Sequence, residues 1–140
     1  MKKVNVLGTE YGIITDDSLV IRGCDGECKS YSKEIRIRKA DDMLCSGDSA
    51  EVKEKRYREV MRHELVHAFF DESGLDEYSN NEQLVTWIAS QFPKMLKAFI
   101  DVGCADMPEP EAVIQLPGVV TPEDYERFKK YVLEGGVIQC

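Results

Sequence analysis

The chain has 140 residues, 43% of them hydrophobic and 31% charged, and its formal net charge is −8. This length suits one domain with a core of its own, and the acidic balance argues against binding to a nucleic-acid backbone, which needs clustered lysine and arginine. Apolar runs of only a few residues argue against a membrane span, and no apolar core follows Lys2 and Lys3, so we expect no secretion signal and a cytoplasmic location. The odd number of cysteines, five, then indicates reduced thiols.

The first forty residues predict short strands. Residues 3–7 alternate valines with polar neighbours, and residues 11–15 are apolar and β-branched. Residues 19–22 are predicted as another short strand, and residues 23–32, rich in glycine, cysteine and charge, as a loop. Residues 34–38 alternate isoleucine with charged side chains, which predicts a half-buried edge strand with one solvated face.

A long helix is predicted over residues 50–72, which contain neither glycine nor proline. Asp48 or Ser49 is a suitable N-terminal cap, and Gly74 is a natural stop after the last turn.

A second helix is predicted to begin at Asn80 or Asn81, after a loop over residues 73–79. Pro93 lies within its pattern and should either kink the helix or end it, because proline removes an internal hydrogen bond. Its apolar face, which we expect in the core, comprises Leu84, Val85, Trp87, Ile88 and Phe92.

The order of these elements predicts an α+β domain over residues 1–103, with a small N-terminal sheet packed on the helices. Residues 104–140 are predicted as a linker and a C-terminal helix that packs on the domain or extends it. Residues 107–111 are acidic and rich in proline, as a linker would be, and residues 121–133 begin with a threonine cap followed by proline.

The segment His63-Glu64-Leu65-Val66-His67 contains both histidines of the chain. Residues four apart on a helix share one face, with side-chain roots about 6 Å apart, so two imidazoles there can bind one zinc ion. Glu64 then points toward a water on that ion and can act as its general base. The alternative is an amphipathic helix with two partly buried histidines.

Catalytic zinc usually takes three protein ligands and a water, and the chain has no third histidine. Glu82 lies in the first turn of the next helix, which a short loop lets run antiparallel to the first. We therefore prefer Glu82 as the third ligand, with Glu77 and Asp76 in reserve. The alternative role of Glu82 is an acid stabilised by the helix dipole.

The residues from the HExxH segment through Glu82-Gln83-Leu84-Val85-Thr86-Trp87-Ile88-Ala89 resemble the gluzincin metallopeptidases. They look most like the small ImmA/IrrE-like group of bacteria, phages and other mobile elements, and the resemblance covers about residues 1–100. It implies a sheet packed on the HExxH helix, zinc bound by His63, His67 and Glu82, and Glu64 as catalytic acid/base. Larger gluzincins place an aspartate four residues after the ligand glutamate to orient a histidine, and here that position is Thr86.

The leading hypothesis is therefore a zinc-dependent peptidase with one zinc ion per chain. Its substrate would be a protein or peptide, and the resemblance suggests a regulator such as a repressor. An alternative from another class is a catalytically silent protease-like fold that binds a protein partner. A weaker alternative is a metal-dependent hydrolase that acts on something other than a peptide.

Two further expectations concern the substrate. The strand over residues 34–38 is expected to pair with an extended peptide by β-addition. Candidate oxyanion donors are the tyrosines Tyr11, Tyr31, Tyr57 and Tyr78, although packing in the core or on the surface is the favoured role of Tyr57 and Tyr78.

Cys24 and Cys28 have a spacing found in structural zinc sites, which would also need Cys45 and a fourth thiol. Plain thiols near a turn are the favoured interpretation of these cysteines.

Overall fold

The structure is a computed structural model that describes residues 2–44 and 49–105. The chain divides into two compact units, residues 1–92 and 93–140, and the sheet and the HExxH segment lie in the first. The predicted boundary after residue 103 stays a prediction, and the predicted helix over residues 121–133 lies outside the described residues.

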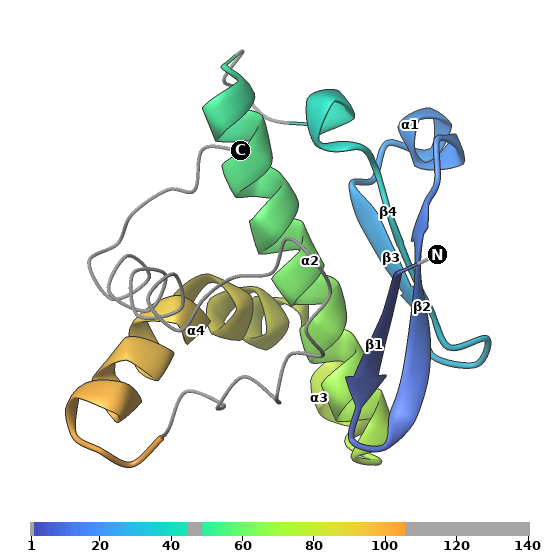
Figure 1. Cartoon of the computed structure of the whole chain (residues 1–140). Helices are drawn as coiled ribbons and strands as arrows, with labels where there is room; N and C mark the ends of the chain where they lie inside the picture. The colour runs from blue at the N-terminus through green and yellow to red at the C-terminus, as the bar shows by residue number, and fades with distance from the viewer. Residues whose placement is uncertain (1, 45–48, 106–140) are drawn as a thin grey trace, which may run out of the picture. The chain divides into compact units, whose positions relative to one another are not determined.

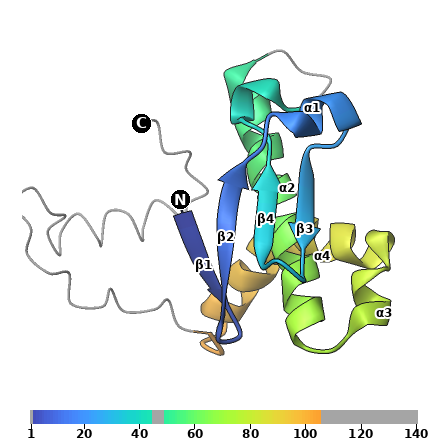
Figure 2. The ribbon, with the colours of Figure 1, turned by 90° about the vertical axis from the view of Figure 1, so that its right-hand side faces the viewer.

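Four strands form one sheet with the order β1-β2-β4-β3 (Figure 2). The strands are β1 (Lys2–Val6), β2 (Thr9–Thr15), β3 (Gly26–Lys29) and β4 (Glu34–Ile37). β1 and β2 form an antiparallel hairpin, β2 and β4 run parallel, and β3 returns antiparallel to β4. The fold is thus α+β with a small N-terminal sheet, as the sequence predicts.

The predicted edge strand is in fact an interior strand. β4 pairs on one side with β2 and on the other with β3, so its backbone has no free side for a peptide. The edge on that side of the sheet is β3, which lies within the segment predicted as a loop. Alternation of apolar and polar residues reports the two faces of a strand, whereas the backbone pairing that decides its place in the sheet leaves no such pattern.

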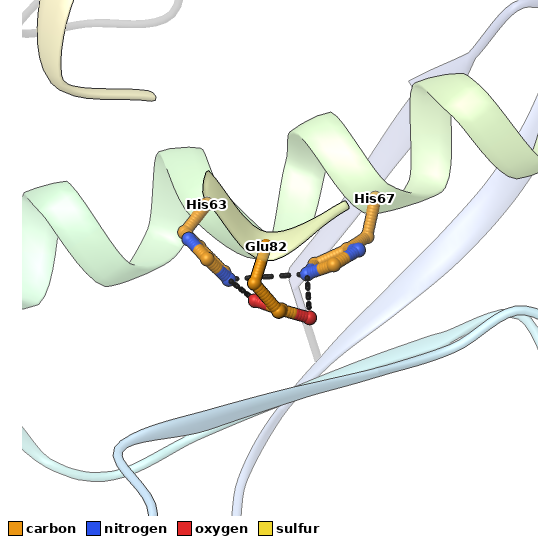
Figure 3. A group of neighbouring side chains, drawn as sticks. All are labelled: His63, His67 and Glu82. Atoms are coloured by element: carbon orange, nitrogen blue, oxygen red, sulfur yellow. Dashed lines mark hydrogen bonds and ion pairs between the residues drawn. The ribbon is translucent and has the colours of Figure 1, made fainter. Parts of the chain in front are cut away.

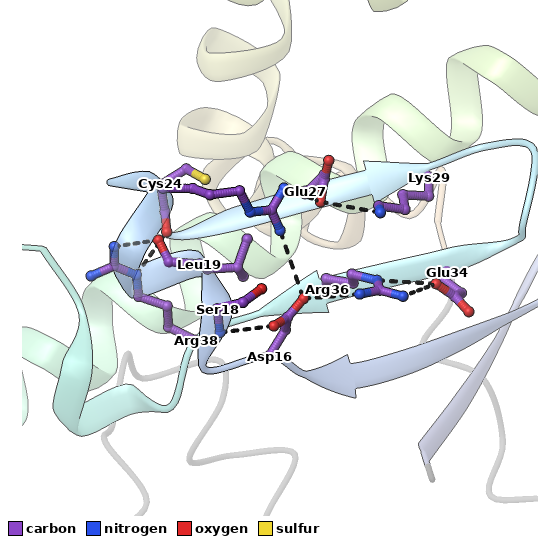
Figure 4. A network of polar contacts seen from close by, with 10 residues as sticks. Asp16, Ser18, Leu19, Cys24, Glu27, Lys29, Glu34, Arg36 and Arg38 are labelled. Carbon is purple, nitrogen blue, oxygen red and sulfur yellow. Dashed lines mark hydrogen bonds and ion pairs between the residues drawn. The ribbon is translucent and has the colours of Figure 1, made fainter.

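Arg38 is also not on a solvated face, because it is only 2% exposed. Its guanidinium donates to the backbone carbonyls of Cys24 at 2.7 Å, Leu19 at 2.8 Å and Asp42 at 3.1 Å, two of which Figure 4 shows. The buried cation is therefore satisfied by three backbone oxygens and by the buried Asp25 carboxylate 3.8 Å away, and it ties the segment that precedes β3 to the segment that follows β4.

Residues predicted as a short strand after β2 form the helix α1 (Ser18–Arg22). The Asp16 carboxylate accepts the Ser18 N–H at 2.9 Å, which starts the turn locally (Figure 4). Only Leu19 of this helix is buried, and the chain leaves it at Gly23, whose φ is 70°. This local hydrogen bond at the start of the helix outweighs the β-propensity of the adjacent branched residues Val20 and Ile21.

The predicted long helix is confirmed as α2 (Ala50–Glu72). Ser49 is its N-terminal cap, with its side chain accepting the N–H of Val52 at 3.2 Å. The chain leaves the helix through Gly74, whose φ of 69° suits glycine.

The predicted loop after α2 contains a short helix, α3 (Asp76–Ser79). The next helix, α4 (Glu82–Asp101), begins beside Asn81, whose side chain accepts the N–H of Leu84 at 3.0 Å. Pro93 does not end this helix. Trp87 and Phe92, expected in the core, are 55% and 46% exposed. No helix within the described ranges is long and apolar enough to cross a membrane.

α2 lies across one face of the sheet (Figure 1). Two clusters of buried side chains fill the space between them. The first comprises Val6, Tyr11, Ile35 and Ala68, and the second Ile37, Met43 and Val60. Burial of these side chains fixes the rotation of α2, because its Val60 and Ala68 must face the sheet. The same rotation determines where the HExxH residues point.

Candidate metal centre

The structure brings together the three side chains predicted as zinc ligands. His63 and His67 lie one turn apart on α2, and Glu82 is the first residue of α4 (Figure 3). The two Nε2 atoms are 3.0 Å apart, and the Glu82 carboxylate oxygens lie 3.1 Å from Nε2 of His63 and 3.5 Å from Nε2 of His67. One nitrogen of each imidazole and the carboxylate therefore converge on one point.

These separations suit a tetrahedral zinc ion. Zinc bonds of about 2.0–2.1 Å at tetrahedral angles place ligand atoms about 3.3 Å from one another. The two Nε2 atoms are 3.0 Å apart, and each lies 3.1–3.5 Å from one of the two Glu82 oxygens, which is close to that value. Two imidazoles and a carboxylate also form a donor set typical of catalytic zinc, so the residues present fit the ion.

Two side-chain hydrogen bonds join α2 to α4 without involving a ligand. Arg62 of α2 donates from Nε to the carbonyl of Ala89 at 2.7 Å, and Ser90 of α4 donates to the Glu59 carboxylate at 3.1 Å. Ala89 and Ser90 lie about two turns beyond Glu82 on α4. Glu82 itself is exposed, with 69% of its side chain accessible, so the site opens to solvent.

Burial lowers the pKa of the His63 imidazole, and the neighbouring His67 lowers it further, while the Glu82 carboxylate opposes the shift. A metal ion needs the neutral imidazole with a free nitrogen lone pair. The shift therefore favours the form of His63 that can bind a metal.

The outer nitrogen of each imidazole lies next to a hydroxyl group. Nδ1 of His63 is 3.4 Å from Oγ1 of Thr86, and Nδ1 of His67 is 3.3 Å from Oγ of Ser79. Thr86 occupies the position at which the larger gluzincins place an aspartate, and Ser79 ends α3. Sequence reasoning named no partner for either ring, and it placed Ser79 in a loop.

Glu64 lies against β3 and lines both clefts beside His63. Its side chain is 6% exposed and faces Gly26, where an added Cβ would lie 2.7 Å from the Glu64 Oε1 atom. The pKa of Glu64 is raised to about 7, mainly by burial and also by the carboxylates of Glu82 and Glu27, against the opposing effect of a hydrogen bond from the Cys28 backbone. A carboxylate with such a pKa can take up and release protons near neutral pH.

Among the described residues, the outer edge of β3 pairs with no other strand. The Asp25 carbonyl accepts the N–H of Arg38 from the neighbouring strand at 3.0 Å, so alternate residues from Asp25 onward bond to β4. Gly26 and Cys28 therefore direct their backbone groups outward. The Cys28 N–H is used by Glu64, which links the edge strand to the candidate base.

Two clefts meet at the candidate metal centre, and both are lined by Gly26, His63 and Glu64. The first, of about 340 Å³, extends toward the start of α2 and is further lined by Leu44, Arg56, Glu59, Val60, Thr86 and Ala89, among others. The second, of about 440 Å³, extends toward α3 and is further lined by Cys28, Ser30, His67, Asp71, Asn80 and Glu82, among others. Together the clefts form a groove that follows β3 past the histidines.

The reserve ligands Asp76 and Glu77 are exposed on α3 and are not part of the ligand group. Cys24 lines the first cleft and Cys28 the second, and neither belongs to a metal-ligand group among residues 2–44 and 49–105. Cys45, the third member of the predicted cage, lies outside these ranges.

The four tyrosines proposed as oxyanion donors do not line either cleft. Tyr11 is buried and donates to the Glu72 carboxylate at 2.7 Å. Tyr57 packs against the second core cluster, Tyr31 is fully exposed, and Tyr78 lies against the Phe70 ring.

No protein family, curated protein or solved structure that we compared with the chain matches it. The resemblance to gluzincins therefore stays a prediction from the HExxH segment and Glu82, and the functional argument depends on the geometry of the site.

Proposed function

We propose that this protein is a zinc-dependent metallopeptidase in which His63, His67 and Glu82 hold one zinc ion and Glu64 is the catalytic acid/base. The observation that carries the proposal is the convergence of the three ligand atoms within 4.8 Å of one another, beside the buried Glu64 carboxylate and an edge of the sheet that no other strand of the described residues covers. A zincin-like arrangement of sheet, α2 and α4 is part of this proposal.

When bound, zinc supplies Lewis acidity, which acidifies a coordinated water and polarises a carbonyl. The Glu64 carboxylate would accept the proton of the attacking water and pass it to the leaving amine. Its pKa of about 7 in the metal-free protein and its burial beside Gly26 support this role. The Cys28 N–H holds the carboxylate in place while it exchanges protons.

The substrate would be an extended peptide segment that pairs with β3 by β-addition. The outward backbone groups of Gly26 and Cys28 lie along the groove, and the two clefts would receive side chains on either side of the scissile bond. This replaces the expectation that the strand over residues 34–38 pairs with the substrate. A protein regulator such as a repressor remains the proposed substrate class, taken from the resemblance.

A second candidate is a catalytically silent fold that binds a protein partner along the same groove. The observation that favours it is the position of the four tyrosines, none of which lines either cleft. Among residues 2–44 and 49–105 the tyrosines therefore supply no oxyanion donor to the clefts, and hydrolysis depends strongly on such a donor.

The test is hydrolysis of a mixed peptide library by the zinc-loaded full chain, with products identified by mass spectrometry. Glu64→Gln should keep the zinc and lose hydrolysis, because the amide cannot accept the proton. Glu77→Gln, at an exposed acid of α3, is the matched control and should retain both. Hydrolysis that survives unchanged in Glu64→Gln contradicts the mechanism. Zinc binding without cleavage of any peptide favours the binding fold.

A further inference from the structure

We propose that the hydroxyls of Thr86 and Ser79 are positioning groups that accept the Nδ1 protons of His63 and His67, so that both rings present Nε2 to the metal. The inference rests on the proposed zinc site. It concerns the tautomer that the two rings adopt when the metal is bound.

Each ring has two distinct environments. On the inner side, the two Nε2 atoms lie 3.0 Å apart and face the Glu82 carboxylate. On the outer side, each Nδ1 lies 3.3–3.4 Å from one hydroxyl oxygen. A neutral imidazole carries its proton on one nitrogen and a lone pair on the other. A proton on Nδ1, donated to the hydroxyl, leaves the Nε2 lone pair free for the ion.

The two hydroxyls come from different elements, and each is placed by the fold. Ser79 ends α3 and is only 8% exposed. Thr86 lies four residues after Glu82 on α4, so both share one face of the helix. The turn that supplies the carboxylate ligand therefore also supplies the partner of His63. This coupling means that docking of α4 on α2 completes the ligand set and orients a ring in one step.

A hydroxyl at position 86 leaves the site with fewer negative charges than the aspartate of the larger gluzincins would. A carboxylate at position 86 would lie one turn from Glu82, and like charges at this spacing repel each other. It would also add a third negative charge to a site that already includes Glu64 and Glu82. The hydroxyl orients the ring without that repulsion, so the site keeps two carboxylates for one divalent ion.

The test is zinc affinity of the full chain, measured by competition with a chromophoric chelator. Thr86→Val keeps the shape and removes the hydroxyl, and we expect a zinc affinity about 10–100-fold weaker, as for other partners of histidine ligands. Thr86→Ser restores the hydroxyl and should restore the affinity. Ser79→Ala should weaken binding in the same direction through His67.

Ser90→Ala is the matched control, because it removes a hydrogen bond between α4 and α2 without touching a histidine. It should bind zinc as the unaltered chain does. If Thr86→Val binds zinc as tightly as the unaltered chain does, the inference is overturned. It is also overturned if Ser90→Ala loses as much zinc affinity as Thr86→Val, because the loss would then come from weaker packing between the helices. Failure of the unaltered chain to bind zinc would instead remove the proposed function itself.

Discussion

Replacing Glu64 by glutamine should stabilise the metal-free protein at neutral pH. The carboxyl of Glu64 is 6% exposed, and its pKa in the folded chain is raised from 4.5 to about 7, first by burial. Above that pH the folded protein must bury a carboxylate charge that the unfolded chain exposes to water. Glutamine has the same shape, and its carbonyl oxygen still accepts the Cys28 N–H, but it carries no charge.

The magnitude follows from the linkage between proton binding and folding. Folding raises the pKa of Glu64 from 4.5 to about 7. Its contribution to the stability of the folded protein is therefore fully present below pH 4.5 and is lost as the pH rises through about 7. A shift of about 2.5 units at 1.36 kcal/mol each gives about 3 kcal/mol. The free energy of unfolding of Glu64→Gln should therefore exceed that of the unaltered protein by an amount that grows by about 3 kcal/mol between pH 4.5 and pH 8.

The assay is urea denaturation of both proteins after removal of metal with a chelator, at four pH values from 4.5 to 8. All other titrating groups are common to the two proteins, so the difference between them isolates Glu64. Added zinc should reduce the difference, because a nearby cation favours the ionised carboxylate. A difference that stays constant from pH 4.5 to pH 8 would refute the burial of an ionisable Glu64 beside β3.

Two further substitutions test the surroundings of the site. Gly26→Ala places a methyl group 2.7 Å from both the Glu64 Oε1 atom and the Val60 Cγ1 atom. Because misplacement of a catalytic group is costly, we expect peptide hydrolysis to fall at least about 10-fold while the zinc content persists. Unchanged hydrolysis would count against the close approach of β3 to Glu64. Glu72→Gln removes a carboxylate that accepts hydrogen bonds from Lys33, Thr9 and Tyr11, which lower the pKa of Glu72 to about 2. Its loss should destabilise the protein at pH 7, and the difference should vanish as pH falls from 4.5 toward 2; urea denaturation across that range measures it, and a difference independent of pH would contradict the network.

The elements that contain the proposed ligands could be predicted from the sequence because their signals are local. α2 has a serine cap, an uninterrupted run of helix-forming residues and a terminal glycine, all within one segment. The spacing of His63 and His67 follows from helix geometry alone. Glu82 could be proposed because an asparagine cap sets the start of α4, and a short connection returns that helix to α2.

The place of each strand could not be predicted, because strand pairing depends on distant segments. Residues 26–29 carry glycine, cysteine and charge, and they form a strand because β4 offers them a partner. Arg38 alternates with isoleucines as a solvated residue would, yet it is buried because three backbone carbonyls from elsewhere in the chain surround it. The identity of the edge strand, and therefore of the proposed peptide-binding strand, was wrong for this reason.

The contacts of the two histidines with hydroxyl groups could not be predicted from the sequence either, because they too depend on distant segments. Thr86 was noted only as a departure from the gluzincin pattern, and Ser79 carried no signal at all. A hydroxyl four residues after the ligand glutamate was visible in the sequence, but its contact with His63 depends on the docking of α4 on α2. Ser79 reaches His67 because α3 forms, and four residues are too few for a periodic pattern.

The central claim is that His63, His67 and Glu82 hold one zinc ion, and elemental analysis of the purified full chain tests it most directly. After zinc is offered and the excess removed, we expect about one zinc per chain in the unaltered protein and in Glu77→Ala. The same treatment should leave His63→Ala and Glu82→Ala without stoichiometric zinc. No zinc in the unaltered protein, or the same zinc content in Glu82→Ala, would contradict the site.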